Sequence, residues 1–320
     1  MQLYPLKLKP VLKTAIWGGT AIPERFGIGA KGDSVAEAWM LTDREDGVNL
    51  IENGPATGMT LAEYAEAVGK ERVYTEDPFP LLIKLIDARD KLSVQVHPDD
   101  AYAASHGLDA GKTEMWYIVD AAPDASLILG IEEGIDRETL RRAAIDGTLE
   151  KYLKRVPVKK GDCCFIPAGL VHAIGGGILI AEIQQNSNTT YRLYDYDRVG
   201  KDGKKRELHL DKALEVIHTQ FDLAAVTVDK TERAGQGSAL RTLCASPVFT
   251  ARSLVLDPGA SAALTGRSLT HVMCLAGSGF LETADGRFPL SCGDSYLLPA
   301  GLSEVSVTAG SAMELVISRP

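Results

Sequence analysis

The stretch GDCCFIPAGLVH, residues 161–172, occurs a second time in the chain as GDSYLLPAGLSE, residues 293–304. The two copies align without gaps, since Gly-Asp and Pro-Ala-Gly-Leu coincide and the residues between them are mostly apolar in both. A short apolar run bounded by Gly, Asp and Pro is typical of a β-strand that ends in a tight turn. The chain is therefore predicted to hold two β-units of similar design.

The repeat extends upstream, where KTEMWYIV at 112–119 lies against the weaker match LTHVMCLA at 269–276. The first copy is longer between its two landmarks, and the excess corresponds to a predicted helical insert over 136–153. Short β-type runs separated by turn residues fill much of the remaining chain, as in β-sandwiches and barrels. The sequence thus predicts a mainly β fold.

Helical signals are few. Thr60 and Glu63 form a capping box before LAEYAEAV, and Asp136 can cap RETLRRAAI. A third helix is predicted over 211–218. All three lie in the part of the chain that holds the first copy of the repeat.

A boundary between the two units is predicted near TERAGQGSAL, residues 231–240. This segment is polar, Gly-rich and aperiodic, so it is interpreted as a linker. We therefore predict an N-terminal domain over 1–230, with helical inserts, and a C-terminal β-domain over 231–320.

Composition narrows the class of protein. The chain has 320 residues, 45% of them hydrophobic, and a net charge of −9. An acidic surface argues against nucleic acid or an anionic membrane as the main partner. Five cysteines without a CxxC pair predict free thiols in a reducing compartment. No signal peptide and no apolar run of membrane-spanning length are visible, so a cytoplasmic location is expected.

Residues that can bind a metal gather around the first copy. Gln95 and His97 alternate with valines in SVQVHPDD, so they point to the same side of a predicted strand. Glu114 begins the next β-run, and His172 ends the repeat unit. Two histidines and a carboxylate are a known catalytic zinc set that suits Fe(II) or Mn(II) equally, whereas Gln95 is a weaker neutral donor. From the pattern alone, hydrogen-bonded structural histidines remain the alternative.

The second copy lacks this set. Glu304 stands where the first copy has His172, and His271 aligns with Glu114 without a second histidine nearby. We interpret His271 as a structural histidine, and the second unit as a structural partner of the first.

A polar, aromatic segment follows the buried run ILIAEIQ. In QNSNTTYRLYDYDR, 185–198, three tyrosines surround Arg192, whose guanidinium can clamp a phosphate or an enediolate oxygen. Aromatic faces of this kind are common in sugar sites, although an exposed edge with ion pairs is the alternative. Lys112, two residues before Glu114, is a second cation near any metal. The basic run KDGKKRELH, 201–209, is interpreted as a solvated loop.

At this point the motifs resemble those of one family, the type I phosphomannose isomerases. The resemblance rests on QVHPDD (95–100), GKTEMWY (111–117), PAGLVHAIGGG (167–177) and TTYRLYDYDR (189–198), with AIWGG (15–19) and AEAWMLTD (36–43) as opening motifs. It is close over the N-terminal two thirds of the chain and looser beyond. One departure is Ala38, where members of the family commonly carry Ser, which leaves the role of that hydroxyl open.

The resemblance implies the fold, the metal and the site. The fold would be a pair of cupin-type β-barrels, or jelly rolls, and each chain would bind one Zn²⁺. The implied metal ligands are Gln95, His97, Glu114 and His172. Lys112 and Arg192 fall on the family's active-site lysine and arginine.

The implied reaction is the interconversion of mannose 6-phosphate and fructose 6-phosphate through an enediolate. Small sugar phosphates would be the partners, and the chain would act as a monomer or homodimer. The base that takes up the proton stays open between Glu182, Asp195 and a hydroxide on the metal. Two other functions also stay open. One is a non-enzymatic sugar-phosphate-binding cupin, and the other is a metal-dependent cupin enzyme with another substrate.

Overall fold

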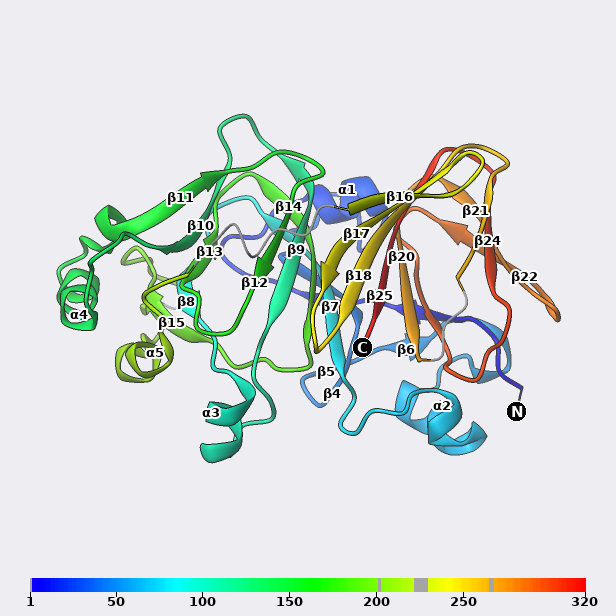
Figure 1. Ribbon diagram of the computed structural model, residues 1–320, viewed down its shortest axis with the longest axis horizontal. Coiled ribbons are helices and arrows are strands. Elements are labelled where there is room, and N and C mark those ends of the chain that lie inside the picture. The colour runs from blue at the N-terminus through cyan, green and yellow to red at the C-terminus, as the bar shows by residue number, and fades with distance from the viewer. Residues whose placement is uncertain (1, 201–202, 222–229, 265–267) are drawn as a thin grey trace.

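The computed structural model describes residues 2–200, 203–221, 230–264 and 268–320, without the side chains of 230–235. Over these residues the chain is mainly β and forms two β-units that lie next to one another (Figure 1). None of the described helices is long and apolar enough to cross a membrane.

The first unit is built from two antiparallel sheets with a cavity between them. The larger sheet runs β12 (Cys163–Ile166), β9 (Glu114–Ala121), β14 (Ile178–Gln185), β7 (Leu81–Ala88), β3 (Glu37–Leu41), β2 (Val11–Lys13). The smaller runs β11 (Leu153–Pro157), β10 (Ser126–Ile131), β13 (His172–Ile174), β8 (Val94–Val96), β15 (Tyr191–Tyr194). Strands β7 and β9 read as continuous apolar runs because both of their faces are buried.

The second unit repeats this plan. Its larger sheet runs β16 (Lys230–Gly235), β17 (Ser238–Ala245), β18 (Thr250–Leu256), β25 (Met313–Arg319), β20 (Thr270–Ala276), β23 (Ser295–Leu298), β1 (Leu6–Lys9), β6 (Leu50–Ile51). The smaller runs β19 (Ser261–Ala263), β24 (Ser306–Ala309), β21 (Ser278–Thr283), β22 (Gly286–Ser291). A two-stranded ribbon pairs β4 (Asp43–Arg44) with β5 (Gly47–Val48).

Strand order confirms the predicted repeat. The order β12-β9-β14-β7-β3 in the first unit matches β23-β20-β25-β18-β17 in the second, and β11-β10-β13-β8 matches β22-β21-β24-β19. The two quoted copies of the repeat contain β12 and β23, which occupy equivalent places. The predicted pair of cupin-type β-units is therefore confirmed.

The upstream part of the alignment is wrong by one residue. Ile166 pairs with Glu114, whereas its counterpart Leu298 pairs with Thr270, so Thr270 and not His271 holds the place of Glu114. The weak match could not fix the register, because a strand buried on both faces has no alternation of polar and apolar residues.

His271 has the structural role predicted for it. Its ring is fully buried, and its Nε2 lies 2.8 Å from the hydroxyl of Ser295, which in turn donates to the carbonyl of Met40. These contacts bind β20, β23 and β3 together.

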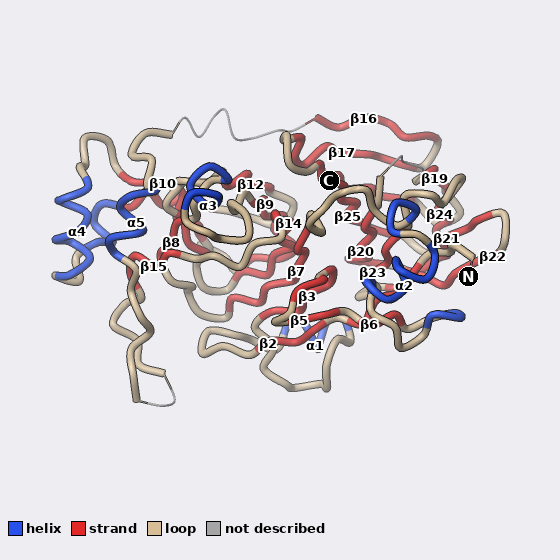
Figure 2. The backbone as a smooth tube through the Cα atoms, turned by 90° about the horizontal axis from the view of Figure 1, so that it is seen from below, coloured by secondary structure: helices blue, strands red, loops and turns tan. Residues whose placement is uncertain are grey.

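The three predicted helices are present. They are α2 (Leu61–Val68), α4 (Arg137–Ile145) and α5 (Leu210–Val216). The capping box of α2 is complete, because Thr60 accepts from the amide of Glu63 and Glu63 accepts from the amide of Thr60. The 3₁₀ turn η3 (Leu149–Tyr152) lies within the predicted helical insert over 136–153. The sequence did not predict the short helices α1 (Ala21–Phe26) and α3 (Asp100–Ser105), or the 3₁₀ turns η1 (Gly54–Ala56) and η2 (Lys70–Arg72). Figure 2 shows α3, α4 and α5 around the first unit and α2 beside the second.

The predicted linker over 231–240 is not a linker. Strands β16 and β17 pair across it, and the turn between them consists of Gln236 and Gly237, with Gly237 at a φ of 71°. A polar two-residue turn that ends in Gly favours a hairpin, because glycine adopts the left-handed conformation without strain. The division at residue 230 remains a prediction, and β1 and β6 show that N-terminal residues also complete the sheet of the second unit.

Candidate metal and active site

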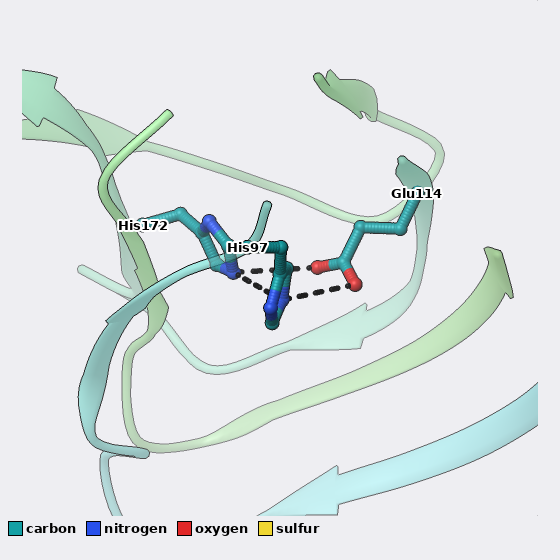
Figure 3. Close-up of side chains that lie close together, drawn as sticks. All are labelled: His97, Glu114 and His172. Carbon is teal, nitrogen blue, oxygen red and sulfur yellow. Dashed lines mark hydrogen bonds and ion pairs between the residues drawn. The ribbon is translucent and has the colours of Figure 1, made fainter. Parts of the chain in front are cut away.

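Three of the predicted metal ligands meet inside the first unit. His97 follows β8, Glu114 begins β9 and His172 begins β13, and all three side chains are buried (Figure 3). Glu114 Oε2 lies 3.5 Å from His97 Nε2, and Glu114 Oε1 lies 3.4 Å from His172 Nε2. Their ligand atoms all lie within 4.8 Å of one another. No other such group of His, Cys, Asp and Glu occurs in the described parts of the chain.

The chemistry of this cluster fits a cation. The Nδ1 atoms of His97 and His172 contact the carbonyl oxygens of Thr189 and Leu170 at 2.9 and 2.8 Å, so Nδ1 is the protonated nitrogen of each ring. The Nε2 lone pairs therefore face each other across 3.1 Å. Neither oxygen of Glu114 accepts a hydrogen bond from the described residues, although the ammonium of Lys112 forms an ion pair with Oε2. Buried acceptors that converge without a donor are unfavourable unless a positive ion lies among them.

The protonation states of the three residues leave their acceptor atoms free to bind a cation at neutral pH. Burial lowers the pKa of His97 to about 3, and burial also lowers the pKa of His172. Burial opposes ionisation of Glu114, but the neighbouring Lys112 ammonium, 3.2 Å away, and the two rings hold the pKa of this carboxyl well below its usual range. The cluster is thus two neutral imidazoles and one carboxylate.

Gln95 lies next to this cluster on the same sheet. In the strand register it is directly opposite His172 on one side and Arg192 on the other. Residues that face each other across antiparallel strands point to the same side of the sheet. The structure therefore brings Gln95 to the cavity, between the histidine and the arginine.

A polar cavity of about 360 Å³ between the two sheets is lined by two neighbours of the cluster, Gln95 and Lys112. Its lining residues include Glu37, Lys84, Gln95, Lys112, Glu182, Asn188, Arg192 and Arg206. Both sheets contribute, since Lys84 and Glu182 lie in the larger sheet and Gln95 and Arg192 in the smaller. A cavity with so many charges suits a polar, anionic ligand.

Lys84 was not predicted as a site residue. It lies in β7 with its ammonium 3.1 Å from Glu182 Oε2 and 3.6 Å from Glu37 Oε2, and its side chain is 5% exposed. Burial alone would lower the pKa of Lys84, but the two carboxylates raise it above its usual value. The run LLIKLIDA reads as a core strand, so only the pairing of neighbouring strands shows that its lysine meets two acids.

The two guanidinium groups that line the cavity differ in their hydrogen-bond partners. Arg192 Nη1 donates to the carbonyl of Glu207 at 2.8 Å, and its buried Nε has no hydrogen-bond acceptor among the described residues. Arg206 reaches the cavity from the basic run and binds Asp195 through both Nε and Nη2. The interpretation of 201–209 as a solvated loop is therefore wrong at Arg206, while residues 201 and 202 lie outside the described residues.

The tyrosines of 185–198 do not line the cavity. Tyr191 and Tyr194 pack in a buried cluster with α4 and α5, and Tyr196 packs against the same cluster. Strand alternation explains the result, because Tyr191 and Arg192 are neighbours in β15 and point to opposite faces. The predicted aromatic platform for a sugar is therefore wrong.

Ala38 faces away from the site. Glu37 and Trp39 line or approach the cavity, while Ala38 between them is part of the core shared by the two units. A hydroxyl at this position would point into that core. The departure from the family pattern therefore removes no group from the cavity.

The second unit has apolar residues where the first has charges. By strand register, Ile317 and Val272 take the places of Glu182 and Trp116. The corresponding cavity, beside Ile317, measures only about 60 Å³. Glu304, the counterpart of His172, is exposed and at a φ of 51°. These residues agree with the predicted structural role of the second unit.

Fold and site together define a double cupin-type protein with a metal-compatible centre in its first unit. Residues 5–122 match the model of the phosphomannose isomerase type I catalytic domain. The mannose-6-phosphate isomerase ManA of Bacillus subtilis (strain 168) is 40% identical over 306 residues, which cover 95% of this chain and 96% of that protein. The chain therefore belongs to the type I phosphomannose isomerases, a family of enzymes, as its motifs predict.

Further relatives agree with this assignment. A mannose-6-phosphate isomerase of Streptococcus mutans is 36% identical over 305 residues, or 92% of each chain. The crystal structure of the mannose 6-phosphate isomerase from Bacillus subtilis matches with a TM-score of 0.90 and 34% identity over all of both chains. A putative mannosephosphate isomerase from Archaeoglobus fulgidus, with a TM-score of 0.77 and 19% identity, shares the fold.

Proposed function

We propose that this chain is a metal-dependent isomerase that interconverts mannose 6-phosphate and fructose 6-phosphate. The observation that carries the proposal is the buried cluster of His97, Glu114 and His172, whose acceptors converge next to residues that line a cationic cavity. The reaction moves a proton from C2 to C1 of the sugar through an enediolate, while the hydroxyl proton on the C2 oxygen moves to the C1 oxygen. Such an intermediate needs a positive charge for its oxygen and a base for its proton.

The metal would be held by His97, Glu114 and His172, with Gln95 as a fourth, neutral ligand. The donor set of two imidazoles and a carboxylate suits Zn²⁺, and one such cluster among the described residues predicts one ion per chain. When bound, the ion supplies a fixed positive charge that stabilises negative charge on a sugar oxygen.

Cationic side chains would hold the rest of the substrate. Arg192 lies two strands from His172 in the smaller sheet, a separation of roughly 10 Å by the usual strand spacing. This distance suits a sugar that has its reacting end near the cluster and its phosphate near Arg192 and Arg206. Lys112, beside Glu114, is then close enough to the reacting end to stabilise an oxyanion.

Glu182 is the carboxylate that we assign as the base. It lines the cavity, and burial raises its pKa, which suits a group that accepts and returns a proton near neutral pH. Asp195 is a poorer candidate, because Arg198 and Arg206 both bind it and hold its pKa below the usual value despite partial burial. In the forward direction Glu182 would take the proton from C2 and return it to C1.

The first experiment is turnover of mannose 6-phosphate, coupled to detection of fructose 6-phosphate. Protein is assayed as purified, after EDTA treatment, and after zinc is restored, with metal content measured at each stage. We expect activity to be lost with the metal and to return with about one zinc per chain. Activity that survives complete removal of metal would contradict the metal dependence. Tight sugar-phosphate binding without product in the zinc-loaded protein would instead indicate a binding protein.

A further inference from the structure

Four residues form one row across the floor of the cavity. Trp39 in β3 is directly opposite Lys84 in β7, Lys84 is opposite Glu182 in β14, and Glu182 is opposite Trp116 in β9. Since opposite residues in antiparallel strands point to the same side, all four side chains lie on the cavity face of the larger sheet. The charged pair is thus enclosed between two tryptophans.

Each tryptophan donates a hydrogen bond to an acid. Trp116 Nε1 donates to Glu182 Oε1 at 3.0 Å, and Trp39 Nε1 donates to Glu37 Oε2 at 2.7 Å. Lys84 lies between the two carboxylates and forms an ion pair with each of them. Every polar group in the row is therefore tied to a neighbour by an ion pair or a hydrogen bond, and one carboxylate oxygen has an ion pair alone.

The oxygen that has an ion pair alone is Oε2 of Glu182. This oxygen is buried, accepts no hydrogen bond from the described residues and forms an ion pair with the ammonium of Lys84 at 3.1 Å. The indole of Trp116 is a neutral hydrogen-bond donor to this carboxylate, and it binds Oε1. The carboxylate is thereby held with one oxygen engaged and the other without a hydrogen bond.

Trp116 is itself held in place. It is the largest of the fully buried side chains among the described residues, and its ring packs edge-to-face on His172 with the ring centroids 5.4 Å apart. A large, enclosed indole has few alternative rotamers, so its N–H has a fixed direction. A neutral donor also fixes the carboxylate without adding a second full charge beside Lys84.

From this geometry we propose that Trp116 is a positioning residue of the isomerase. Its indole N–H holds Oε1 of Glu182 and so directs Oε2 toward the carbon-bound proton of the substrate. The proposal rests on the function proposed above, with Glu182 as the base. Trp116 acts through Glu182 and touches no reacting atom.

A double-mutant cycle tests the role in catalysis. We expect Trp116→Phe to lower kcat about 10- to 100-fold, as for other supporting contacts in active sites, with KM changed less than about 3-fold. Zinc content should stay at the wild-type value. Because Trp116 acts through Glu182, adding Trp116→Phe to Glu182→Gln should cause little further loss. Losses that multiply, or a loss of kcat explained by lost zinc, would overturn the proposal.

A matched variant separates positioning from packing. Tyr296→Phe removes the 2.7 Å hydrogen bond from a fully buried tyrosine to the carbonyl of Pro289 in the second unit, far from the cavity residues. We expect Tyr296→Phe to lower thermal stability by an amount similar to Trp116→Phe and to leave kcat unchanged. An equal fall of kcat in both variants would show that lost packing is the cause.

A second measurement uses no activity. The chain has three tryptophans, so a ¹⁵N–¹H spectrum of the zinc protein should contain three indole resonances. Glu182→Gln keeps Trp116 and removes the charge that its N–H faces. We expect this variant to shift the one resonance that Trp116→Phe removes. An unmoved resonance would overturn the positioning role, whereas absent turnover in wild-type protein would overturn the proposed function, so the two failures are separate observations.

Discussion

Two buried histidines, His97 and His271, have similarly low pKa values but different surroundings. Burial lowers the pKa of both His97 and His271 to about 3, so both rings are neutral at physiological pH. His271 has a hydroxyl partner at Nε2, whereas His97 Nε2 faces a second imidazole and a carboxylate. Ser295 donates its proton to Met40, so Nε2 of His271 is the protonated nitrogen, and its Nδ1 has no hydrogen-bond partner among the described residues. The difference that indicates a metal site is therefore that the unprotonated nitrogen of His97 faces further acceptors, and the pKa carries no such information.

His271 should make folding stability depend on pH. Its folded pKa lies far below the usual value near 6.5, so below pH 6.5 the unfolded chain binds more protons and stability is lost as the pH falls. Between pH 7 and pH 5 this one ring should cost about 2 kcal/mol. We expect His271→Gln, which can keep the bond to Ser295 without titrating, to reduce the pH dependence of urea unfolding by that amount.

The control for this prediction is His106→Gln. His106 is exposed on the surface just after α3, so this variant shows the effect of a His→Gln replacement outside the core. An unaltered slope in His271→Gln would show that the ring of His271 is already accessible to protons in the folded protein.

At the scale of elements, the Pro-Ala-Gly turn connects the two histidine segments. The amide of Gly169 donates to the carbonyl of His97 at 2.9 Å, and the carbonyl of Gly169 accepts from the amide of His218 at 2.9 Å. Three residues later the chain reaches His172 at the start of β13. The turn therefore ties together the segments of two proposed metal ligands that are far apart in sequence.

Gly169→Ala should disturb the metal centre through this turn. Gly169 has a φ of 85°, and a Cβ atom there would lie 2.8 Å from the ring of His218. Left-handed backbone costs an alanine about 1 kcal/mol, and the clash must in addition shift the turn that holds His97. We expect stability to fall, zinc affinity to fall about 10-fold and kcat/KM to fall with it.

Gly161→Ala is the matched control. Gly161 has a φ of 89° but open space around the position of a Cβ, so it should lose a similar stability and keep zinc and activity. The interpretation of the turn would fail if both variants kept their zinc, as measured by titration with a competing chelator.

Elements also show how far the sequence could predict this site. His97, Glu114 and His172 lie at strand ends beside recognisable turns, so their residue types stand out. Lys84 could not be predicted in this way, because it lies inside an apolar run and its partners are on neighbouring strands. Local patterns show which face a residue takes only when the strand alternates, and the buried strands of this sheet do not.

The same reasoning explains two of the wrong interpretations. The hairpin over 231–240 looked like a linker because turn residues and polar edge strands share a composition. The tyrosines of 191–196 looked like a sugar platform because aromatic residues mark both sugar sites and small hydrophobic cores. In both cases the local sequence was compatible with two structures, and tertiary packing determined which of them formed.

At the scale of the whole molecule, the two units share one hydrophobic core. The largest buried cluster combines residues of β7 and β9 in the first unit with residues of β18, β20 and β25 in the second. Figure 2 shows β3 and β7 next to the strands of the second unit. Tyr117 adds a polar contact by donating to Glu314 at 2.5 Å. One face of the larger sheet of the first unit therefore borders the charged cavity, and its other face packs against the second unit.

This shared core predicts that the two units unfold together. All three tryptophans, at 17, 39 and 116, lie in the first unit, so their fluorescence reports that unit, while far-ultraviolet circular dichroism reports both. Phe249 belongs to the second unit and is 1% exposed within the shared core. We expect Phe249→Ala to cost about 3–5 kcal/mol and to move both unfolding transitions to the same lower denaturant concentration. If circular dichroism moved while tryptophan fluorescence stayed in place, the units would be independently stable, and the second would not be needed to hold the floor of the cavity.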